Sequence, residues 1–376
     1  MSAEMSGKHL HFIGIGGSSM SGLARFMLQK GCAVSGSDRD ASHKTEALEK
    51  LGVKVCIGHS AENVHGVDLV VYSAAIPESN PERAEAKKLG IPQVERAVLL
   101  GRLMSTFDQA ICVSGTHGKT TTTSMIAQIF VEAGEDPGVH IGGELDAIGG
   151  GTRVGGGNTF IAEACEYSGS FWHFYPTIAV ILNIDEDHLD FYKDLDDIEA
   201  SFRRFAGLVP EDGWVVGWGD DPRVRHVLSA LKCRTRTYGL EPYNELRAED
   251  ISYDELGRPR FTVTLYGHPL CEVELAVSGE KNLLDALAAI YARYVVSALE
   301  RLYDPRRGLT AAERRERARR IQAQPLYIRL RPRFHGAMGL IAGSPLLALP
   351  AGWALHMMHA HLGGLFTRLR AKTHKI

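Results

Sequence analysis

The stretch Val113-Ser-Gly-Thr-His-Gly-Lys-Thr-Thr-Thr-Thr-Ser124 decides the fold that this sequence predicts. The apolar run 110–113 before it is typical of a short buried strand, and the apolar spacing of 124–131 is typical of a helix. A strand, a glycine loop with Lys and Thr, and a helix form an arrangement that holds nucleotide phosphates. The loop amides and the helix N-terminus face the anion, Lys119 adds positive charge, and a Thr hydroxyl can reach Mg2+.

This glycine loop is shorter than the usual phosphate loop. Val113 stands where the usual spacing has its first glycine, which leaves the pattern Gly115-x-x-Gly118-Lys119-Thr120. The structural alternative is a turn rich in Gly and Thr that simply precedes a helix. We favour phosphate binding, because the lysine and the threonine directly follow the second glycine.

Composition limits the class of protein before any motif is considered. A chain of 376 residues predicts two or three domains, and 44% hydrophobic with 23% charged residues is typical of a soluble globular protein. The net charge of −3 gives no general attraction to nucleic acid, so no nucleic-acid partner is expected. The six cysteines are scattered without a C-x-x-C pair, and no signal segment opens the chain. These features predict a cytoplasmic protein with reduced thiols.

Residues 9–38 predict a strand, a glycine turn, a helix and a second strand that ends at Asp38. This is the opening of a domain for a nucleotide-type ligand, with the amides of the turn facing a pyrophosphate. A dinucleotide fingerprint would need its third glycine where Ser19 stands, which weakens the match. A nicotinamide cofactor remains an alternative ligand. Asp38 is either a ribose ligand or a solvated acid in a turn. The pattern repeats up to residue 101, which predicts a Rossmann-like domain at residues 1–107.

A second domain, at residues 108–296, begins with the phosphate loop. Its glycine-rich segment 134–157 predicts irregular structure around short strands. Two later apolar runs, at 159–171 and 177–183, predict strands that end in acids and a histidine. The carboxyl ends of strands form the ligand edge of an open α/β sheet, where carboxylates suit Mg2+. We therefore favour a metal role over a surface role for Glu166 and His188, and Glu163 stays undecided.

Several stretches, in the same order along the chain, resemble the Mur ligase family of bacterial cell-wall enzymes. They are spread over the first 290 residues or so, which makes a chance resemblance improbable. The stretches are His11-Phe-Ile-Gly-Ile-Gly-Gly-Ser-Ser-Met-Ser-Gly-Leu-Ala24, Val34-Ser-Gly-Ser-Asp38, Tyr72-Ser-Ala-Ala-Ile-Pro77, Ser114-Gly-Thr-His-Gly-Lys-Thr-Thr-Thr122, Ala162-Glu-Ala-Cys-Glu-Tyr-Ser-Gly-Ser-Phe171, Asn183-Ile-Asp-Glu-Asp-His-Leu-Asp190 and Gly279-Glu-Lys-Asn282.

The resemblance implies an α/β fold with an N-terminal Rossmann-like domain and a central ATPase-type domain with a phosphate loop. It implies an ATP- and Mg2+-dependent ligase of peptidoglycan synthesis, and the members it resembles most join L-alanine to UDP-N-acetylmuramate. In that reaction the substrate carboxylate is activated as an acyl phosphate before the amino group of L-alanine attacks. A phosphoryl transfer of this kind needs a phosphate cradle, a lysine and metal-held oxygens rather than a strong nucleophile, which agrees with the residues themselves.

The resemblance also assigns residues by motif. Lys119 would neutralise the β- and γ-phosphates, and Lys119, Glu166 and His188 would be the catalytic set. The metal ligands would be Thr120, Glu166 and His188. The nucleotide would contact Gly115, Thr116, His117, Gly118, Lys119, Thr120, Thr121 and, at adenine, Asn282. The UDP-sugar would contact Gly14, Gly16, Gly17, Ser18, Asp38 and Ser73.

The chain departs from the family pattern at two places. The family usually has His-Asn at Lys281-Asn282 and often a second Asn at Asp285. From about residue 297 we also see none of the signatures of the third domain that such ligases carry. Residues 297–376 hold 15 of the 42 Lys and Arg residues but only 4 of the 45 Asp and Glu residues, which leaves 27 against 41 before them.

Four origins of this atypical, basic tail stay open, with irregular or partly helical structure expected. A shifted reading frame or fusion error is favoured over a solvated basic extension, and membrane contact and a basic arm for nucleic acid or anionic lipid are not expected. If the third domain is missing, the chain is an inactive ligase or a non-catalytic protein that binds nucleotide and UDP-sugar. Another Mur-type ligase, such as one that recycles murein tripeptide, is a further alternative.

Overall fold

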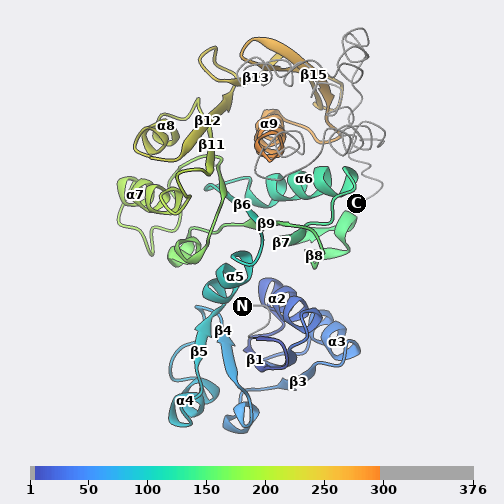
Figure 1. Cartoon of the computed structure of the whole chain (residues 1–376), viewed down its shortest axis with the longest axis vertical. Coiled ribbons are helices and arrows are strands. Elements are labelled where there is room, and N and C mark those ends of the chain that lie inside the picture. The colour runs from blue at the N-terminus through green and yellow to red at the C-terminus, as the bar shows by residue number, and fades with distance from the viewer. Residues whose placement is uncertain (1–4, 297–376) are drawn as a thin grey trace, which may run out of the picture. The chain divides into compact units, whose positions relative to one another are not determined.

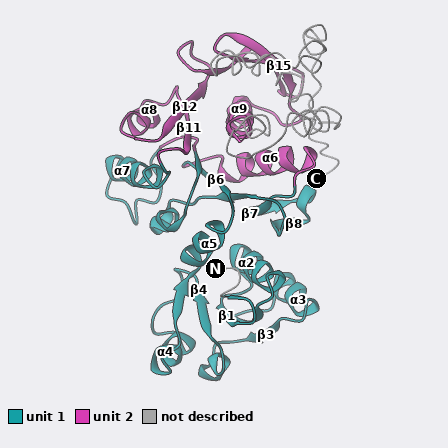
Figure 2. Cartoon of the chain, in the orientation of Figure 1, with its two compact units in different colours: residues 1–115, 136–179, 185–210 teal, residues 116–135, 180–184, 211–376 magenta. Residues whose placement is uncertain are grey.

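The computed structural model describes residues 5–296, and the predicted basic tail at 297–376 lies outside the described residues. The chain forms two compact units (Figure 2). Unit 1 comprises residues 1–115, 136–179 and 185–210, and unit 2 comprises 116–135, 180–184 and the residues from 211 onward. Because the two units alternate along the chain, they do not correspond to the division at residue 107, which stays a prediction.

The N-terminal part of unit 1 is a five-stranded parallel sheet in the order β3-β2-β1-β4-β5 (Figure 1). Its strands are β1 (His9–Ile13), β2 (Ala33–Asp38), β3 (Lys54–Ile57), β4 (Leu69–Tyr72) and β5 (Gln93–Glu95). Its helices are α2 (Ser18–Gln29), α3 (His43–Lys50), the 3-10 turn η1 (Ala61–Val64), α4 (Pro81–Lys88) and α5 (Arg96–Met104). The central strands are buried on both faces, with Leu10, Phe12 and Val70 fully inaccessible, as parallel sheets require. The Rossmann-like prediction is confirmed.

Local signals explain where two of these helices begin. Asn80 caps α4 by accepting hydrogen bonds from the backbone N–H groups of Glu82 and Arg83, and Pro81 fits the first helical position. Ser42 and Thr45 form a reciprocal capping box at the start of α3. Strand β4 ends at Tyr72, because the chain turns at Ser73 directly after it.

The remainder of unit 1 contains four strands in the order β6-β9-β7-β8, with β8 antiparallel to β7. The prediction of short strands within irregular structure at 134–157 is confirmed, because β7 and β8 form there with the turn η2 and non-strand residues around them. Ladder hydrogen bonds to β9 outweigh the low strand preference of glycine there. The elements are β6 (Gln109–Ser114), β7 (Gly138–Leu145), η2 (Asp146–Ile148), β8 (Gly150–Arg153), β9 (Thr159–Glu163), η3 (Tyr167–His173) and α7 (Leu195–Ala206). Strand β10 (Ile178–Ile181) contributes residues to both units.

Unit 2 contains two packed helices, α6 and α9, and a set of strands in which β11, β12 and β13 are parallel while β14 and β15 are antiparallel (Figure 1). Helix α9 is buried on nearly all sides, even at Arg293, which pairs with Glu135 at 2.7 Å. The elements are α6 (Lys119–Glu132), β11 (Trp214–Trp218), α8 (Pro222–Ser229), β12 (Arg234–Gly239), β13 (Leu246–Tyr253), β14 (Pro259–Leu265), β15 (His268–Glu274) and α9 (Glu280–Val295). Among the described residues, no helix is both long and apolar enough to cross a membrane.

Candidate nucleotide, metal and sugar sites

The predicted phosphate loop leads directly into α6, which begins at Lys119, five residues before the predicted helix. Gly118 is the N-cap and has a φ of +87°, a conformation that side chains rarely adopt. A Cβ atom at Gly118 would also lie 2.6 Å from Oδ1 of Asp285. Two independent reasons therefore require glycine at this position of the loop.

Asn183 holds the loop in shape within unit 2. Its backbone carbonyl accepts a hydrogen bond from the N–H of Thr116 at 3.1 Å, and its Oδ1 accepts one from the N–H of His117 at 2.8 Å. Its Nδ2 donates to the carbonyl of His117 at 3.0 Å. Sequence reasoning quoted Asn183 within a motif but gave it no role. Asn183 therefore fixes the backbone of the loop at Thr116 and His117.

The start of α6 has the chemistry of an anion site. Because glycine has no side chain, the N-cap Gly118 satisfies none of the N–H groups of the first turn, and these carry partial positive charge. Thr120 and Thr121 in that turn are exposed, and Nζ of Lys119 donates to the carbonyl of Thr116 at 3.1 Å. Backbone donors, an ammonium group and threonine hydroxyls together suit a nucleotide phosphate.

Two residues at the start of α9 complete the description of this region. The predicted adenine contact Asn282 has its Nδ2 hydrogen-bonded to the carbonyl of Ser278 at 2.8 Å. Asp285 is 4% exposed, and its Oδ1 accepts a hydrogen bond from Oγ1 of Thr122 at 3.0 Å. Burial raises the pKa of Asp285 to about 6, although the Thr122 hydrogen bond and the charge of Lys281 oppose the rise.

In unit 1 the structure brings together the predicted metal residues Glu166 and His188, and it adds Asp187. One possible ligand atom of each residue lies within 4.8 Å of the other two, and Nε2 of His188 is 3.9 Å from Oε1 of Glu166. Tyr192 donates from its hydroxyl to the carbonyl of Glu166 at 2.6 Å. His188 has a φ of +53°, which is uncommon outside glycine and often marks functional positions. The two carboxylates of this group fit Mg2+, which prefers oxygen ligands.

The predicted UDP-sugar residues Gly14, Gly16, Gly17, Ser18, Asp38 and Ser73 all lie at or just after the carboxyl ends of β1, β2 and β4. In a parallel sheet these ends share one edge. The backbone N–H of Gly16 donates to Oδ2 of Asp38 at 2.8 Å, and a Cβ atom at Gly16 would lie 2.9 Å from that oxygen. Asp38 therefore closes the glycine turn, and its role toward ribose stays a prediction.

Ser19, which replaces the third glycine of a dinucleotide fingerprint, belongs to a cluster that sequence reasoning missed. Its Oγ accepts a hydrogen bond from Arg96 at 2.9 Å and lies 2.7 Å from Nε2 of His140. Nδ1 of His140 lies 3.2 Å from Oγ1 of Thr152. Burial, with the nearby charge of Arg96, lowers the pKa of His140 to about 3 and keeps the imidazole neutral. Arg96 thus supplies the positive charge of this cluster.

A second missed cluster surrounds Glu82 in α4, behind the ends of β2 and β3. Oε2 of Glu82 accepts a hydrogen bond from Oγ of Ser37 at 2.6 Å and lies 3.2 Å from Nδ1 of His59. Its Oε1 accepts from Asn63 and lies 3.7 Å from Nε2 of His11. Burial alone would raise the pKa of Glu82, but the nearby imidazole of His11 and the hydrogen bonds from Ser37 and Asn63 outweigh it and lower the pKa to about 2.

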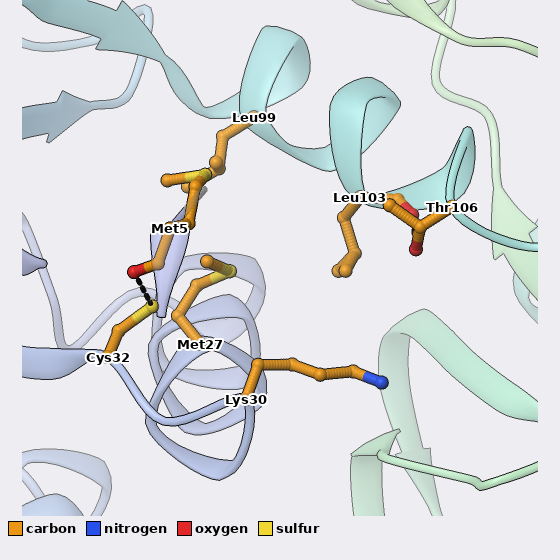
Figure 3. Close-up of a pocket in the computed structure, with 7 residues that line it drawn as sticks. All are labelled: Met5, Met27, Lys30, Cys32, Leu99, Leu103 and Thr106. Carbon is orange, nitrogen blue, oxygen red and sulfur yellow. Dashed lines mark hydrogen bonds between the residues drawn. The ribbon is translucent and has the colours of Figure 1, made fainter. Parts of the chain in front are cut away.

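Figure 3 shows a small pocket elsewhere in unit 1. Its lining is mostly apolar, and the Nζ atom of Lys30 lies 5.6 Å from the ring centroid of Phe26 and 5.7 Å from that of Phe107. The lining residues are Met5, Met27, Lys30, Cys32, Leu99, Leu103 and Thr106. The pocket contains none of the predicted site residues, and we assign it to packing.

Comparison with protein families gives two adjoining matches. Residues 9–108 match the model "Mur ligase family, catalytic domain", and residues 113–293 match "Mur ligase middle domain". The chain is 51% identical over 290 residues to the UDP-N-acetylmuramate–L-alanine ligase of Acetivibrio thermocellus and 50% identical over 289 residues to that of Caldanaerobacter subterraneus. Each alignment covers 77% of this chain, but it spans only 62% and 63% of the respective relative.

Two solved structures share the fold. A UDP-N-acetylmuramate:L-alanyl-gamma-D-glutamyl-meso-diaminopimelate ligase from Neisseria meningitides superposes with a TM-score of 0.72 at 29% identity, over 78% of this chain and 95% of that one. A UDP-N-acetylmuramate–alanine ligase from Thermotoga maritima superposes with a TM-score of 0.68 at 28% identity, over 77% of this chain and 65% of that one. Both likenesses support the α/β architecture described above.

Proposed function

We propose, because this chain belongs to the Mur ligase family, that it acts in the ATP-dependent joining of L-alanine to UDP-N-acetylmuramate during peptidoglycan synthesis. The observation that carries the proposal is the phosphate loop, in which Asn183 fixes the backbone ahead of α6 and Lys119 opens the helix. The identity of about half to ligases for L-alanine supports the choice of substrates. We assign the UDP-sugar to residues 1–107 and ATP to residues 108–296, in the cytoplasm, where both nucleotides are made.

The proposed chemistry has two steps. The substrate carboxylate takes the γ-phosphoryl group of ATP, which forms an acyl phosphate and releases ADP. The amino group of L-alanine then attacks the acyl carbon, an amide bond forms, and inorganic phosphate leaves with loss of a proton from the amine. Neither step needs an enzyme nucleophile, so the protein contributes positioning and neutralisation of charge.

We assign the roles of the chain's own residues on this basis. Lys119 and the first turn of α6 bind the β- and γ-phosphates of ATP. Glu166 and His188, which lie together in unit 1, would hold Mg2+, whose charge would stabilise the transferring phosphoryl group, and the role of Thr120 as a further ligand stays a prediction. The donor set of Glu166, Asp187 and His188 supports this assignment, because hard oxygen ligands are what Mg2+ prefers. We also assign Arg96 to an anionic group of the UDP-sugar, since it adds charge beside Ser19 in the first turn of α2.

A second candidate function is a ligase that attaches a murein peptide rather than L-alanine. The observation that favours it is the superposition on the Neisseria ligase, which this chain matches over 95% of that structure. A third candidate is a protein that binds both nucleotides without forming an amide, for which the phosphate loop and the glycine turn would be sufficient. The three candidates differ in the acceptor and in whether phosphate release depends on it.

One assay separates these candidates. The purified full chain is incubated with ATP, Mg2+ and UDP-N-acetylmuramate, with either L-alanine or L-alanyl-γ-D-glutamyl-meso-diaminopimelate as acceptor. Phosphate release and product mass are measured in parallel. Product with L-alanine alone supports the proposal, and product with the tripeptide alone supports the second candidate. Nucleotide binding without acceptor-dependent phosphate release contradicts both ligase functions.

We predict that Lys119→Ala lowers ATP turnover by about a thousandfold, because a preorganised charge that stabilises a transition state is worth factors of this size. Initial rates of phosphate release measure the effect. The matched control is Lys30→Ala, which removes a lysine outside the proposed site and should leave the rate unchanged. Retention of turnover by Lys119→Ala would remove the phosphate-loop assignment.

A further inference from the structure

Asp285 lies directly behind the phosphate loop. Its carboxyl group accepts a hydrogen bond from Oγ1 of Thr122 in α6 at 3.0 Å, and it is so close to Gly118 that a Cβ atom there would be 2.6 Å from Oδ1. The side chain is 4% exposed. A titratable acid is therefore buried against the backbone at which the proposed function places the phosphates of ATP.

The surroundings of Asp285 stabilise its charge poorly. Burial raises the pKa to about 6, and the hydrogen bond from Thr122 and the charge of Lys281 on the same helix oppose this only in part. Tyr238 in β12 is also affected, since burial and then the negative charge of Asp285 raise the pKa of this phenol. The carboxyl group is thus near the midpoint of its titration just below neutral pH.

Other charged groups belong to the elements that pack against α9. His117 lies in the loop and Lys119 is the first residue of α6, while Asp220 and Asp221 follow β11. The two aspartates act on Tyr238 with the same sign as Asp285 does. Lys119 is the cation of this group that the proposed function assigns to the phosphates. Bound phosphate would place negative charge on the loop side of Asp285.

A nucleoside triphosphate at the loop would change the protonation equilibrium of Asp285. Phosphate oxygens bring several negative charges to the N-terminus of α6, and like charges at short range favour the neutral form of a carboxyl group. The neutral acid still accepts the hydrogen bond from Thr122, and it can also donate one. Protonation therefore removes the repulsion without losing the contact that holds α6.

We propose that Asp285 is a positioning residue of the nucleotide site that takes up one proton from solvent when a nucleoside triphosphate binds. The carboxylate, the proton and the nucleotide combine to give the complex with a neutral acid at position 285, so binding consumes a proton and no bond to the nucleotide forms. Nucleotide affinity then falls as pH rises above the titration range of the free protein, by up to tenfold per pH unit until the bound state also loses its proton. This inference rests on the proposed binding of ATP at the loop.

Calorimetric titration of the full chain tests the proposal. The probe is the non-hydrolysable ATP analogue AMP-PNP with Mg2+, titrated at pH 7 in two buffers of different ionisation enthalpy, which gives the number of protons taken up. The key comparison is with Asp285→Asn, which keeps the shape and is always neutral. Protons that the nucleotide itself exchanges cancel in this difference. Asp250→Asn, at an exposed position of β13, is the matched control.

We expect the wild type and Asp250→Asn to take up about half a proton to one proton more per nucleotide than Asp285→Asn. The ratio of the dissociation constants of the wild type and Asp285→Asn should also rise between pH 6.5 and 8. Asp285→Ala is a second neutral variant, should Asp285→Asn fail to fold. Binding with equal proton uptake in the wild type and the neutral variants would overturn the role of Asp285 alone. A wild type that binds no AMP-PNP would overturn the nucleotide site and, with it, this inference.

Discussion

Glu82 in unit 1 and Asp285 in unit 2 are both buried carboxyl groups, each next to a loop that we assign to ligand binding. Glu82 is 0% exposed and Asp285 is 4% exposed, so burial opposes the charge of both. Glu82 nevertheless has a pKa lowered to about 2, whereas that of Asp285 is raised to about 6. Burial alone therefore does not decide the charge of an acid in this protein.

The difference lies in the hydrogen-bond donors around each group. Glu82 accepts hydrogen bonds from Ser37 and Asn63 and has His11 and His59 close by. At Asp285, a hydrogen bond from Thr122 and the charge of Lys281 oppose the rise in pKa that burial causes. Several hydrogen bonds to a charged form stabilise it more than burial destabilises it. The surroundings of Glu82 fix the strand ends around a permanent charge, and those of Asp285 leave a charge that can be removed.

The largest expected effect on stability is that of Glu82→Ala, which would remove the charge that four polar side chains face. We expect a loss of about 3 kcal/mol in the free energy of unfolding at pH 7, because the buried donors would be left without an acceptor. Unfolding in urea, followed by fluorescence, measures the loss. The isosteric variant Glu82→Gln keeps an acceptor oxygen and should lose less.

The loss at Glu82 also has a predicted pH dependence. The folded pKa of about 2 is below the ordinary 4.5, so the charge stabilises the fold above pH 4.5, and this contribution is lost as pH falls toward 2. The difference between the wild type and Glu82→Ala should therefore shrink over this window. A difference that is constant from pH 7 to pH 3 would contradict a stabilising charge at Glu82.

Asp285→Asn should change the free energy of unfolding in the opposite direction to Glu82→Ala, and by less. The folded pKa of about 6 is above the ordinary 3.8, so the stability contributed by Asp285 is fully present below pH 4 and lost as pH rises through 6. A neutral amide avoids that loss, and we expect Asp285→Asn to be more stable than the wild type by about 2 kcal/mol at pH 7.5. Urea unfolding without nucleotide at pH 7.5 and pH 4 measures it. An equal gain at both values would point to packing rather than charge.

Neither buried acid could have been recognised from the sequence, although the loops beside them could. The phosphate loop and the glycine turn are continuous stretches, whose local spacing predicts a strand, a loop and a helix. The partners of the acids are distant: Asp285 and Thr122 are 163 residues apart, and Glu82 and Ser37 are 45 residues apart. The residues Asn80 and Pro81 account for the start of α4 but say nothing about what Glu82 faces.

The same limit explains two other differences. Segment 134–157 was predicted as irregular structure around short strands because of its glycines, yet β7 extends over 8 residues, because β9 offers a parallel partner. Asp187 was passed over beside His188, because an acid next to a motif histidine is ordinary in sequence. Only the left-handed backbone of His188 and the proximity of Glu166 make the three residues a group.

Thr122→Val gives the smallest expected effect and tests the comparison most closely, because it removes a single donor from Asp285 while keeping the shape of the side chain. The pKa of Asp285 should be higher in Thr122→Val than in the wild type, so the variant should lose stability over a pH range that extends further upward. We expect the free energy of unfolding at neutral pH to change by about 1 kcal/mol. Thermal unfolding between pH 4 and 8 without nucleotide locates the midpoint of this range. Thr121→Val, one residue earlier and exposed, is the matched control and should leave the midpoint unchanged. If both variants left it unchanged, donors would not be what separates Asp285 from Glu82, and the electrostatic surroundings of α9 would have to account for the difference.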